Sequence, residues 1–325
     1  MCNRSTLHHR GRIVTEMVYL LFIGGLALLL FGGDQLVRGG ARIAETLGVP
    51  HIIVGLSVVA FATSAPEFFT SLSAALEGRG EIAIGNVIGS NIANILIVLG
   101  LPALFCSVPS NRPMVLTNTN IMIFASLLLV PMCLYGEISR IFGAVLFACA
   151  FGVVVYWIDA ARRGRVDNAD GETSAGRNGF LLSALQILVA VAAMPLGAGL
   201  LVENGAAVAR HWGVSEAVIG VSLIAVGTSL PEIAAMTLAA MRKQMELAIG
   251  NAIGSNIFNI FFVLGSVALI QPIEVASHFL GFDLWVMLAV SFVLLPFLLG
   301  GRDIGKVAGG VFLLCYAGFI FVLTT

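Results

Sequence analysis

Two glutamates, Glu67 and Glu232, stand inside long apolar stretches of the chain. An ionised carboxylate in the middle of a membrane costs roughly 2.5–3.5 kcal/mol or more, so it needs a partner. Lys and Arg occur only at the ends of these stretches, which leaves a cation that comes from solvent as the natural partner. A protonated, hydrogen-bonded structural role is the alternative. The recurrence of the same surroundings at both glutamates argues against it.

A proline precedes each glutamate, at Pro66 and Pro231. Within a helix, proline removes one backbone hydrogen bond and pushes away the carbonyl four residues earlier, here that of Ala62 or Gly227. Carbonyls freed at membrane depth are tolerated where they line a cavity or bind ions. Beside a glutamate, the proline therefore indicates a binding site rather than a simple kink.

Neutral oxygen ligands share the helical faces of the two glutamates. Thr63 and Ser64 lie four and three residues before Glu67, and the same spacing recurs in the second half of the chain. Two further polar stripes have a spacing of four: Asn86, Ser90 and Asn94, then Asn251, Ser255 and Asn259. Such an all-oxygen set without Cys or His suits Ca²⁺ or Na⁺ rather than zinc or copper. Two carboxylates balance one Ca²⁺ or two Na⁺.

These residues belong to an internal repeat. Residues 55–100 align with residues 220–265 at a constant offset of 165, with 24 of 46 positions identical by direct comparison. Matched polar motifs in one register indicate a duplication. Each copy also carries a GxxxG pair, Gly85 and Gly89 or Gly250 and Gly254, which predicts close packing of helices.

The composition predicts an integral membrane protein. Of the 325 residues, 58% are hydrophobic and 11% are charged, against about 25% charged in soluble domains. This excludes a soluble enzyme or a disordered scaffold, and the balance of 17 basic and 18 acidic residues excludes a nucleic-acid binder. Ten apolar runs without period-2 alternation predict an all-α fold with ten transmembrane helices in the lipid bilayer.

The runs divide the chain into two five-helix halves. We expect a polar N-terminal tail at residues 1–16, with Met17 as an alternative start, then a first half at 17–160, a linker at 161–179 and a second half at 180–325. Because five is odd, the halves enter the membrane from opposite sides and form inverted-topology repeats. This architecture places a site near the midplane and is typical of alternating-access transporters.

The Lys and Arg residues set the expected orientation. Both termini of a ten-helix chain lie on one face, which collects six basic residues, while the other face collects eleven. Basic loops remain in the cytoplasm, so both termini are predicted to be non-cytoplasmic.

The motifs resemble those of a known family. They read ATSAPE at 62–67, GTSLPE at 227–232, GNVIGSNIAN at 85–94 and GNAIGSNIFN at 250–259. These look like the α-repeats of the cation/Ca²⁺ exchanger superfamily, in its prokaryotic sodium/calcium exchanger branch. The resemblance implies Na⁺-coupled Ca²⁺ antiport by alternating access in a bacterial or archaeal inner membrane.

The resemblance also implies a ligand set around Glu67 and Glu232. Its side-chain or backbone oxygens would come from Thr63, Ser64, Thr228, Ser229, Ser90, Asn94, Ser255 and Asn259, with carbonyls of Ala60 and Ala225 toward one end. Some family members carry Asp at one of the positions of Asn94 and Asn259. Both are amides here, so the pocket keeps two carboxylates.

Other functions fit less well. A Ca²⁺/H⁺ antiporter on the same scaffold is the main alternative, since protons could replace Na⁺ at the carboxylates. A membrane-embedded enzyme is not expected, because HExxH and GxSxG motifs are absent from the sequence. A channel is disfavoured because a deep site with two carboxylates binds too well for fast conduction. The resemblance implies no resident cofactor and no obligate protein partner.

Overall fold

A computed structural model describes residues 4–110, 112–167, 177–214 and 227–324, with side chains for residues 16–110, 112–163, 179–214 and 227–323. The first half comprises α1 (Arg4–Leu47), α2 (His51–Val54), η1 (Gly55–Val59), α3 (Ala60–Thr63), α4 (Ala65–Leu76), α5 (Gly80–Ala93), η2 (Asn94–Val98), α6 (Gly100–Ala103), α7 (Pro113–Leu134), β1 (Glu137–Ile138) and α8 (Arg140–Asp167). The second half comprises α9 (Arg177–His211), α12 (Leu230–Met241), α13 (Met245–Phe258), η4 (Asn259–Leu264), α14 (Gly265–Ile270), β2 (Ile273–Glu274), α15 (Ser277–Gly281), α16 (Asp283–Phe292), α17 (Leu295–Leu299) and α18 (Lys306–Thr324).

Helices make up most of the described chain, and β1 and β2 pair antiparallel in one short sheet with Glu137 opposite Glu274. Seven of its helices are long and apolar enough to cross a membrane, and the bent pair His51–Thr63 and Ala65–Leu76 makes an eighth. Leu230–Met241 and Asp283–Leu299 are shorter apolar helices. The predicted all-α class with membrane-spanning helices is confirmed, and the count of ten stays a prediction.

Three expected boundaries, after residues 16, 160 and 179, fall inside helices. α1 begins at Arg4, so the described part of the expected N-terminal tail, residues 4–16, is helical. α8 continues to Asp167 and α9 begins at Arg177, so the described ends of the expected linker at 161–179 are helical as well.

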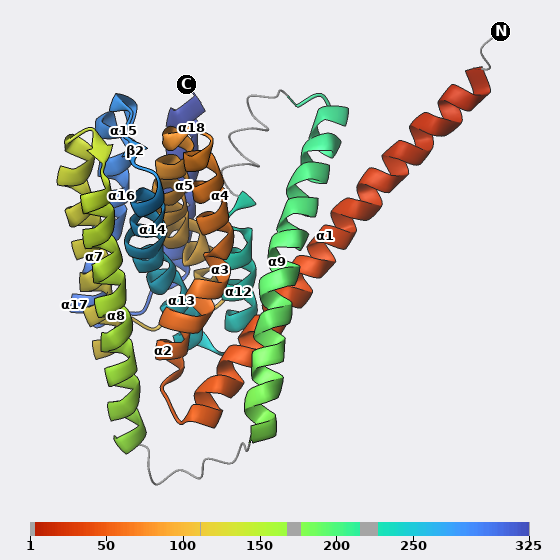
Figure 1. Ribbon diagram of the computed structural model, residues 1–325. Coiled ribbons are helices and arrows are strands. Elements are labelled where there is room, and N and C mark those ends of the chain that lie inside the picture. The colour runs from red at the N-terminus through yellow and green to blue at the C-terminus, as the bar shows by residue number, and fades with distance from the viewer. Residues whose placement is uncertain (1–3, 111, 168–176, 215–226, 325) are drawn as a thin grey trace.

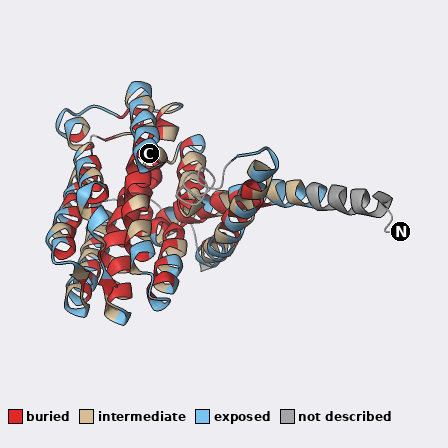
Figure 2. Cartoon of the chain, turned by 90° about the horizontal axis from the view of Figure 1, so that it is seen from above, coloured by how far each residue is buried: buried red, intermediate tan, exposed pale blue. Residues whose placement is uncertain are grey.

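The outer surface of the bundle is apolar. Leu20, Phe69, Ile141 and Leu314 each expose more than 60% of their area, at 69%, 66%, 75% and 73%. Buried residues concentrate between the helices, and exposed ones lie on their outward faces (Figure 2). An apolar exterior of this extent fits lipid rather than water as the surrounding solvent.

Helices α1 and α9 pack against each other beside the main bundle and cross at an angle, so that the N-terminal part of α1 extends away from α9 (Figure 1). Glycines allow this approach, because a Cβ at Gly25 would stand 2.7 Å from the Leu201 nitrogen and one at Gly197 would stand 2.5 Å from the Leu29 nitrogen. Asp34 of α1 also accepts a hydrogen bond of 2.6 Å from Nε of Arg242, at the end of α12. The α1–α9 pair thus contacts the bundle through an ion pair.

Helices α5 and α13 form the centre of the bundle. All twelve residues from Leu247 to Phe258 of α13 are buried. Outside this centre, Ser126 of α7 and Ser291 of α16 hydrogen bond at 3.0 Å, and these two residues are also separated by 165 positions. Equivalent residues of the two halves therefore meet across the core.

The second GxxxG pair packs as predicted. A Cβ at Gly250 would lie 2.5 Å from the Ile52 carbonyl oxygen, and one at Gly254 would lie 2.4 Å from the Leu56 carbonyl oxygen. α13 therefore contacts the backbone of α2 and η1, which lead to the bent helix carrying Glu67. For the first pair, a Cβ at Gly85 would lie 3.2 Å from the Phe279 ring. The equivalent of α2 and η1, at 216–224, lies outside the described residues, so the packing of this pair against it stays a prediction.

We predict that Gly254→Ala lowers the thermal unfolding midpoint of the purified protein, because its methyl group would collide with backbone that cannot rotate away. Overpacking of this kind costs about 1–3 kcal/mol. Gly152→Ala is the matched control, since no described atom lies within 4 Å of its Cβ position. Equal midpoints for the two variants would contradict the close crossing.

Candidate functional site

Each glutamate occupies the first turn of a helix, and for Glu67 this helix restarts after a break. α3 ends at Thr63, Ser64 has φ −83° and ψ 3°, and α4 then begins with Pro66 in its first turn at a bend of 42°. Ser229 has φ −84° and ψ 1° before α12, which also has proline in its first turn. The N-terminal end of a helix carries partial positive charge, so both carboxylates sit where the backbone stabilises anions.

The two carboxylates are completely buried, with 0% of either residue exposed. Ser64, three residues before Glu67, places its hydroxyl 3.4 Å from a carboxylate oxygen of Glu232, so the two glutamates belong to one region. Within the described residues, the ion pairs lie elsewhere and involve neither glutamate. Two buried like charges without a fixed basic partner are unfavourable unless a cation or protons neutralise them.

Serine hydroxyls supply the hydrogen bonds that the carboxylates receive. Ser90 Oγ donates to Glu67 Oε1 at 3.4 Å, and Ser64 Oγ donates to Glu232 Oε1 at 3.4 Å. The second bond joins the first copy of the repeat to the second. The other oxygen of each carboxylate, Oε2, is buried without a hydrogen-bond partner.

Threonines of each copy reach into the other copy. Thr63 Oγ1 lies 3.0 Å from Asn251 Oδ1 and 3.3 Å from Ser255 Oγ. Ser90 Oγ and Thr228 Oγ1 lie 3.4 Å apart. Hydroxyl groups of the two copies thus meet at two places along the boundary between them.

The amide ends of the two polar stripes complete the set. Asn94 and Asn259 are the first residues of the π-helical segments η2 and η4, and such segments are frequent at functional sites. The Oδ1 atoms of both amides are buried and unpaired, as is Ser229 Oγ. The described residues contain no group of three or more His, Cys, Asp and Glu side chains that could hold a metal, so neutral oxygens supply most of the candidate ligands.

The structure gathers most of the predicted ligands in one buried region. They are Thr63, Ser64, Glu67, Ser90, Asn94, Ser229, Glu232, Ser255 and Asn259, all buried, and the half-buried Thr228. The Ala60 carbonyl accepts a hydrogen bond from Thr63 Oγ1 at 3.3 Å, and Ala225 lies outside the described residues. A Ca²⁺ ion takes six to eight oxygens, and this region offers that number.

Three asparagines have roles that their spacing did not indicate. Asn86 donates to the backbone oxygen of Glu67 at 3.2 Å and to Ser71 Oγ at 3.0 Å, so it holds α5 against α4. Asn91 and Asn256 lie off the polar stripes but contact Asn259 and Asn94. The one sign of these roles in the sequence is that Asn91 and Asn256 occupy matched positions in the two repeats.

Two crevices approach the buried region, and both reach Thr228. One, of about 550 Å³, passes Ser90, Asp283 and Tyr316, between α5, α16 and α18. The other, of about 570 Å³, passes Pro66, Pro195 and Val202, between α4, α9 and α12. The oxygens therefore lie at the meeting point of two possible access routes.

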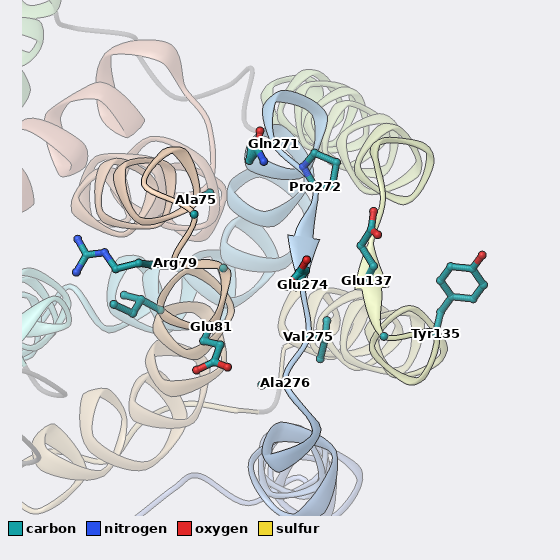
Figure 3. A pocket seen from close by; sticks show the side chains of 14 residues that line it. Ala75, Arg79, Glu81, Tyr135, Glu137, Gln271, Pro272, Glu274, Val275 and Ala276 are labelled. Atoms are coloured by element: carbon teal, nitrogen blue, oxygen red, sulfur yellow. The ribbon is translucent and has the colours of Figure 1, made fainter.

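A larger pocket, of about 950 Å³, lies at the end of the bundle near the β1–β2 sheet, where its lining includes Glu81, Glu137 and Glu274 (Figure 3). In that view Arg79 points away from the pocket. Glu137 and Glu274 are opposite each other in the sheet, but among the described residues these carboxylates do not form a group of three that could hold a metal ion. This pocket is therefore not the candidate site.

Comparisons with known proteins agree with the geometry. The family model described as sodium/calcium exchanger protein matches residues 17–158 and 182–325. The chain is 34% identical over 306 residues to the inner membrane protein YrbG of Escherichia coli, covering 92% of this chain and 94% of YrbG. It is 31% identical over 342 residues to the sodium/calcium exchanger MaX1 of Methanosarcina acetivorans, covering 94% and 98%.

A solved structure of the sodium-calcium exchanger NCX_Mj, soaked with Na⁺ and Sr²⁺, superposes with a TM-score of 0.79 at 29% identity. The match covers 93% of this chain and 97% of the NCX_Mj chain. Sequence, fold and family model agree over nearly the whole length, and the chain belongs to the sodium/calcium exchanger protein family.

Proposed function

We propose that the protein exchanges Na⁺ for Ca²⁺ across a membrane and that both ions bind at Glu67 and Glu232. The observation that carries this proposal is the pair of fully buried carboxylates without a fixed basic partner, surrounded by unpaired buried oxygens. The relatives MaX1 and NCX_Mj, which are named as sodium/calcium exchangers, support the choice of ions.

Charge balance makes the two ions exclude each other. One Ca²⁺ neutralises both carboxylates, and Na⁺ ions in the same region do so as well. Adding Na⁺ to a site that already holds Ca²⁺ leaves excess buried positive charge, which is costly in a medium of low dielectric. Each ion therefore leaves before the other binds, as exchange requires.

Alternating access follows if only the neutralised site can pass between its two exposed states. We assign the movement to α1 and α9, which pack tightly on each other through glycines and contact the bundle through the Asp34–Arg242 pair. In this proposal the two halves are inverted-topology repeats of five helices each, and their pseudo-symmetry makes the outward-open and inward-open states similar in energy.

The orientation is part of the proposal. α1 begins and α18 ends toward the same end of the molecule (Figure 1), which fits an even number of crossings. With the predicted ten crossings, eleven of the 17 basic residues fall on the face opposite the termini. We therefore place both termini outside the cytoplasm, in a prokaryotic inner membrane such as the one that the name of YrbG specifies.

We predict that Glu67→Gln and Glu232→Gln each reduce Ca²⁺ uptake into Na⁺-loaded proteoliposomes by about 100-fold or more. Each variant removes one of the two charges that neutralise Ca²⁺, and breaking a buried charge pair costs about 3–5 kcal/mol. Glu81→Gln is the matched control, because Glu81 is an exposed carboxylate outside the site. Its uptake should equal that of the wild type.

Retained uptake in both variants would defeat the proposed site. The same vesicles separate Na⁺ from H⁺ coupling: with pH held equal on both sides, uptake should follow the Na⁺ gradient. Uptake that ignores the Na⁺ gradient and follows a pH gradient instead would establish the Ca²⁺/H⁺ alternative.

For orientation, we predict that alkaline phosphatase fused after Thr325 is active in bacterial cells, because this enzyme folds only outside the cytoplasm. Green fluorescent protein at the same position should be dark after export. Bright fluorescence with inactive phosphatase would reverse the proposed orientation while leaving the ion site intact.

A further inference from the structure

Asn91 of α5 and Asn256 of α13 face each other reciprocally at the centre of the bundle. Asn91 Nδ2 donates to the backbone oxygen of Asn256 at 3.4 Å, and Asn256 Nδ2 donates to the backbone oxygen of Asn91 at 3.3 Å. Both residues are buried, with 3% and 1% of their area exposed. Each of them also contacts one ligand candidate of the opposite copy.

The backbone contacts fix which way the Asn91 and Asn256 amides point. A backbone carbonyl only accepts hydrogen bonds, so the nitrogen of each amide must face it. The sulfur of Met122, 3.3 Å from Asn256 Nδ2, is likewise a weak acceptor. The Oδ1 atoms of Asn91 and Asn256 are therefore directed to the other side.

These two oxygens fix the next pair of amides. Asn94 Nδ2 donates to Asn256 Oδ1 at 3.0 Å, and Asn259 Nδ2 donates to Asn91 Oδ1 at 3.1 Å. The reverse orientation would place two amide oxygens against each other in a buried place, which is strongly unfavourable. Oδ1 of Asn94 and of Asn259 must then lie on the opposite side of each amide, and both are buried and unpaired.

We propose that Asn91 and Asn256 are positioning residues, which present the amide oxygens of Asn259 and Asn94 to the transported cation and keep the NH₂ groups away from it. Without them, either amide could rotate and turn a donor toward the ion, which would repel it. The inference rests on the proposed cation site. It explains why two amides need such support, whereas a carboxylate at the same position would offer oxygen in either orientation.

The test measures Ca²⁺ binding by calorimetry on the purified full-length protein. Asn256→Ala should weaken binding about tenfold in the wild-type background, in the range expected for losing a buried hydrogen bond. In an Asn94→Asp background, Asn256→Ala should not weaken binding, because the carboxylate needs no orientation. In that background, the loss of Asn256 Oδ1 also removes an unfavourable contact between this oxygen and the carboxylate that replaces the Asn94 amide.

Asn118→Ala is the control for loss of a buried amide. Asn118 in α7 accepts a hydrogen bond of 2.7 Å from Trp157 Nε1, away from the cluster of asparagines. This change should lower the thermal midpoint and leave Ca²⁺ affinity unchanged in both backgrounds. A merely structural role for Asn256 would give the same loss of affinity in both backgrounds, which would overturn the proposal.

If Asn256→Ala does not fold, the equivalent residues of the other copy provide an independent double-mutant test. Asn91→Ala combined with Asn259→Asp should show the same rescue. If Asn91→Ala and Asn256→Ala both unfold, and neither Asn259→Asp nor Asn94→Asp restores folding or Ca²⁺ binding, the two residues have a structural role. That result would reject the positioning role. If the wild-type protein binds no Ca²⁺, the proposed function itself fails. If the wild-type protein binds Ca²⁺ but Asn256→Ala weakens binding equally in both backgrounds, only the positioning role fails.

Discussion

The burial of two carboxylates without a fixed counter-charge is the constraint on which the rest of the structure depends. Glu67 and Glu232 are fully buried, so the protein carries an unfavourable charge unless cations or protons neutralise it. Within the part of the chain that the structure describes, the ion pairs give neither glutamate an Arg or Lys partner. In the exchange that we propose, the transported cation takes the place of a fixed basic partner. When that cation leaves, another must bind at the two carboxylates.

The fold meets this constraint by making each copy of the repeat complete the other. Ser64 of the first copy contacts Glu232 of the second, and Ser90 connects Glu67 with Thr228. The same principle orients the asparagines, since each amide proposed as a ligand, Asn94 and Asn259, donates to a partner in the opposite copy. Neither half can form the site alone. Glycines in α13 bring the backbones close enough for these short side chains to meet.

The helical membrane fold, the repeat and most candidate ligands could be predicted from the sequence. A glutamate within an apolar run is easily recognised, and the same motif recurs 165 residues later. Contacts across the repeats were not predictable. Asn91 and Asn256 lie off the polar stripe, and their role depends on how α5 crosses α13. The packing of Gly250 and Gly254 followed from their spacing, whereas the contact of Gly85 with Phe279 depends on the position of α15.

Anomalous scattering from crystals grown with Ca²⁺ tests the shared site most directly. The account predicts one strong peak bound by oxygens of both Glu67 and Glu232, at the distances of about 2.3–2.6 Å that are usual for Ca²⁺. Hydroxyl or amide oxygens from both repeats should complete its coordination. A peak bound by only one glutamate, or one at Glu81, Glu137 and Glu274 with none at the buried pair, would contradict the account.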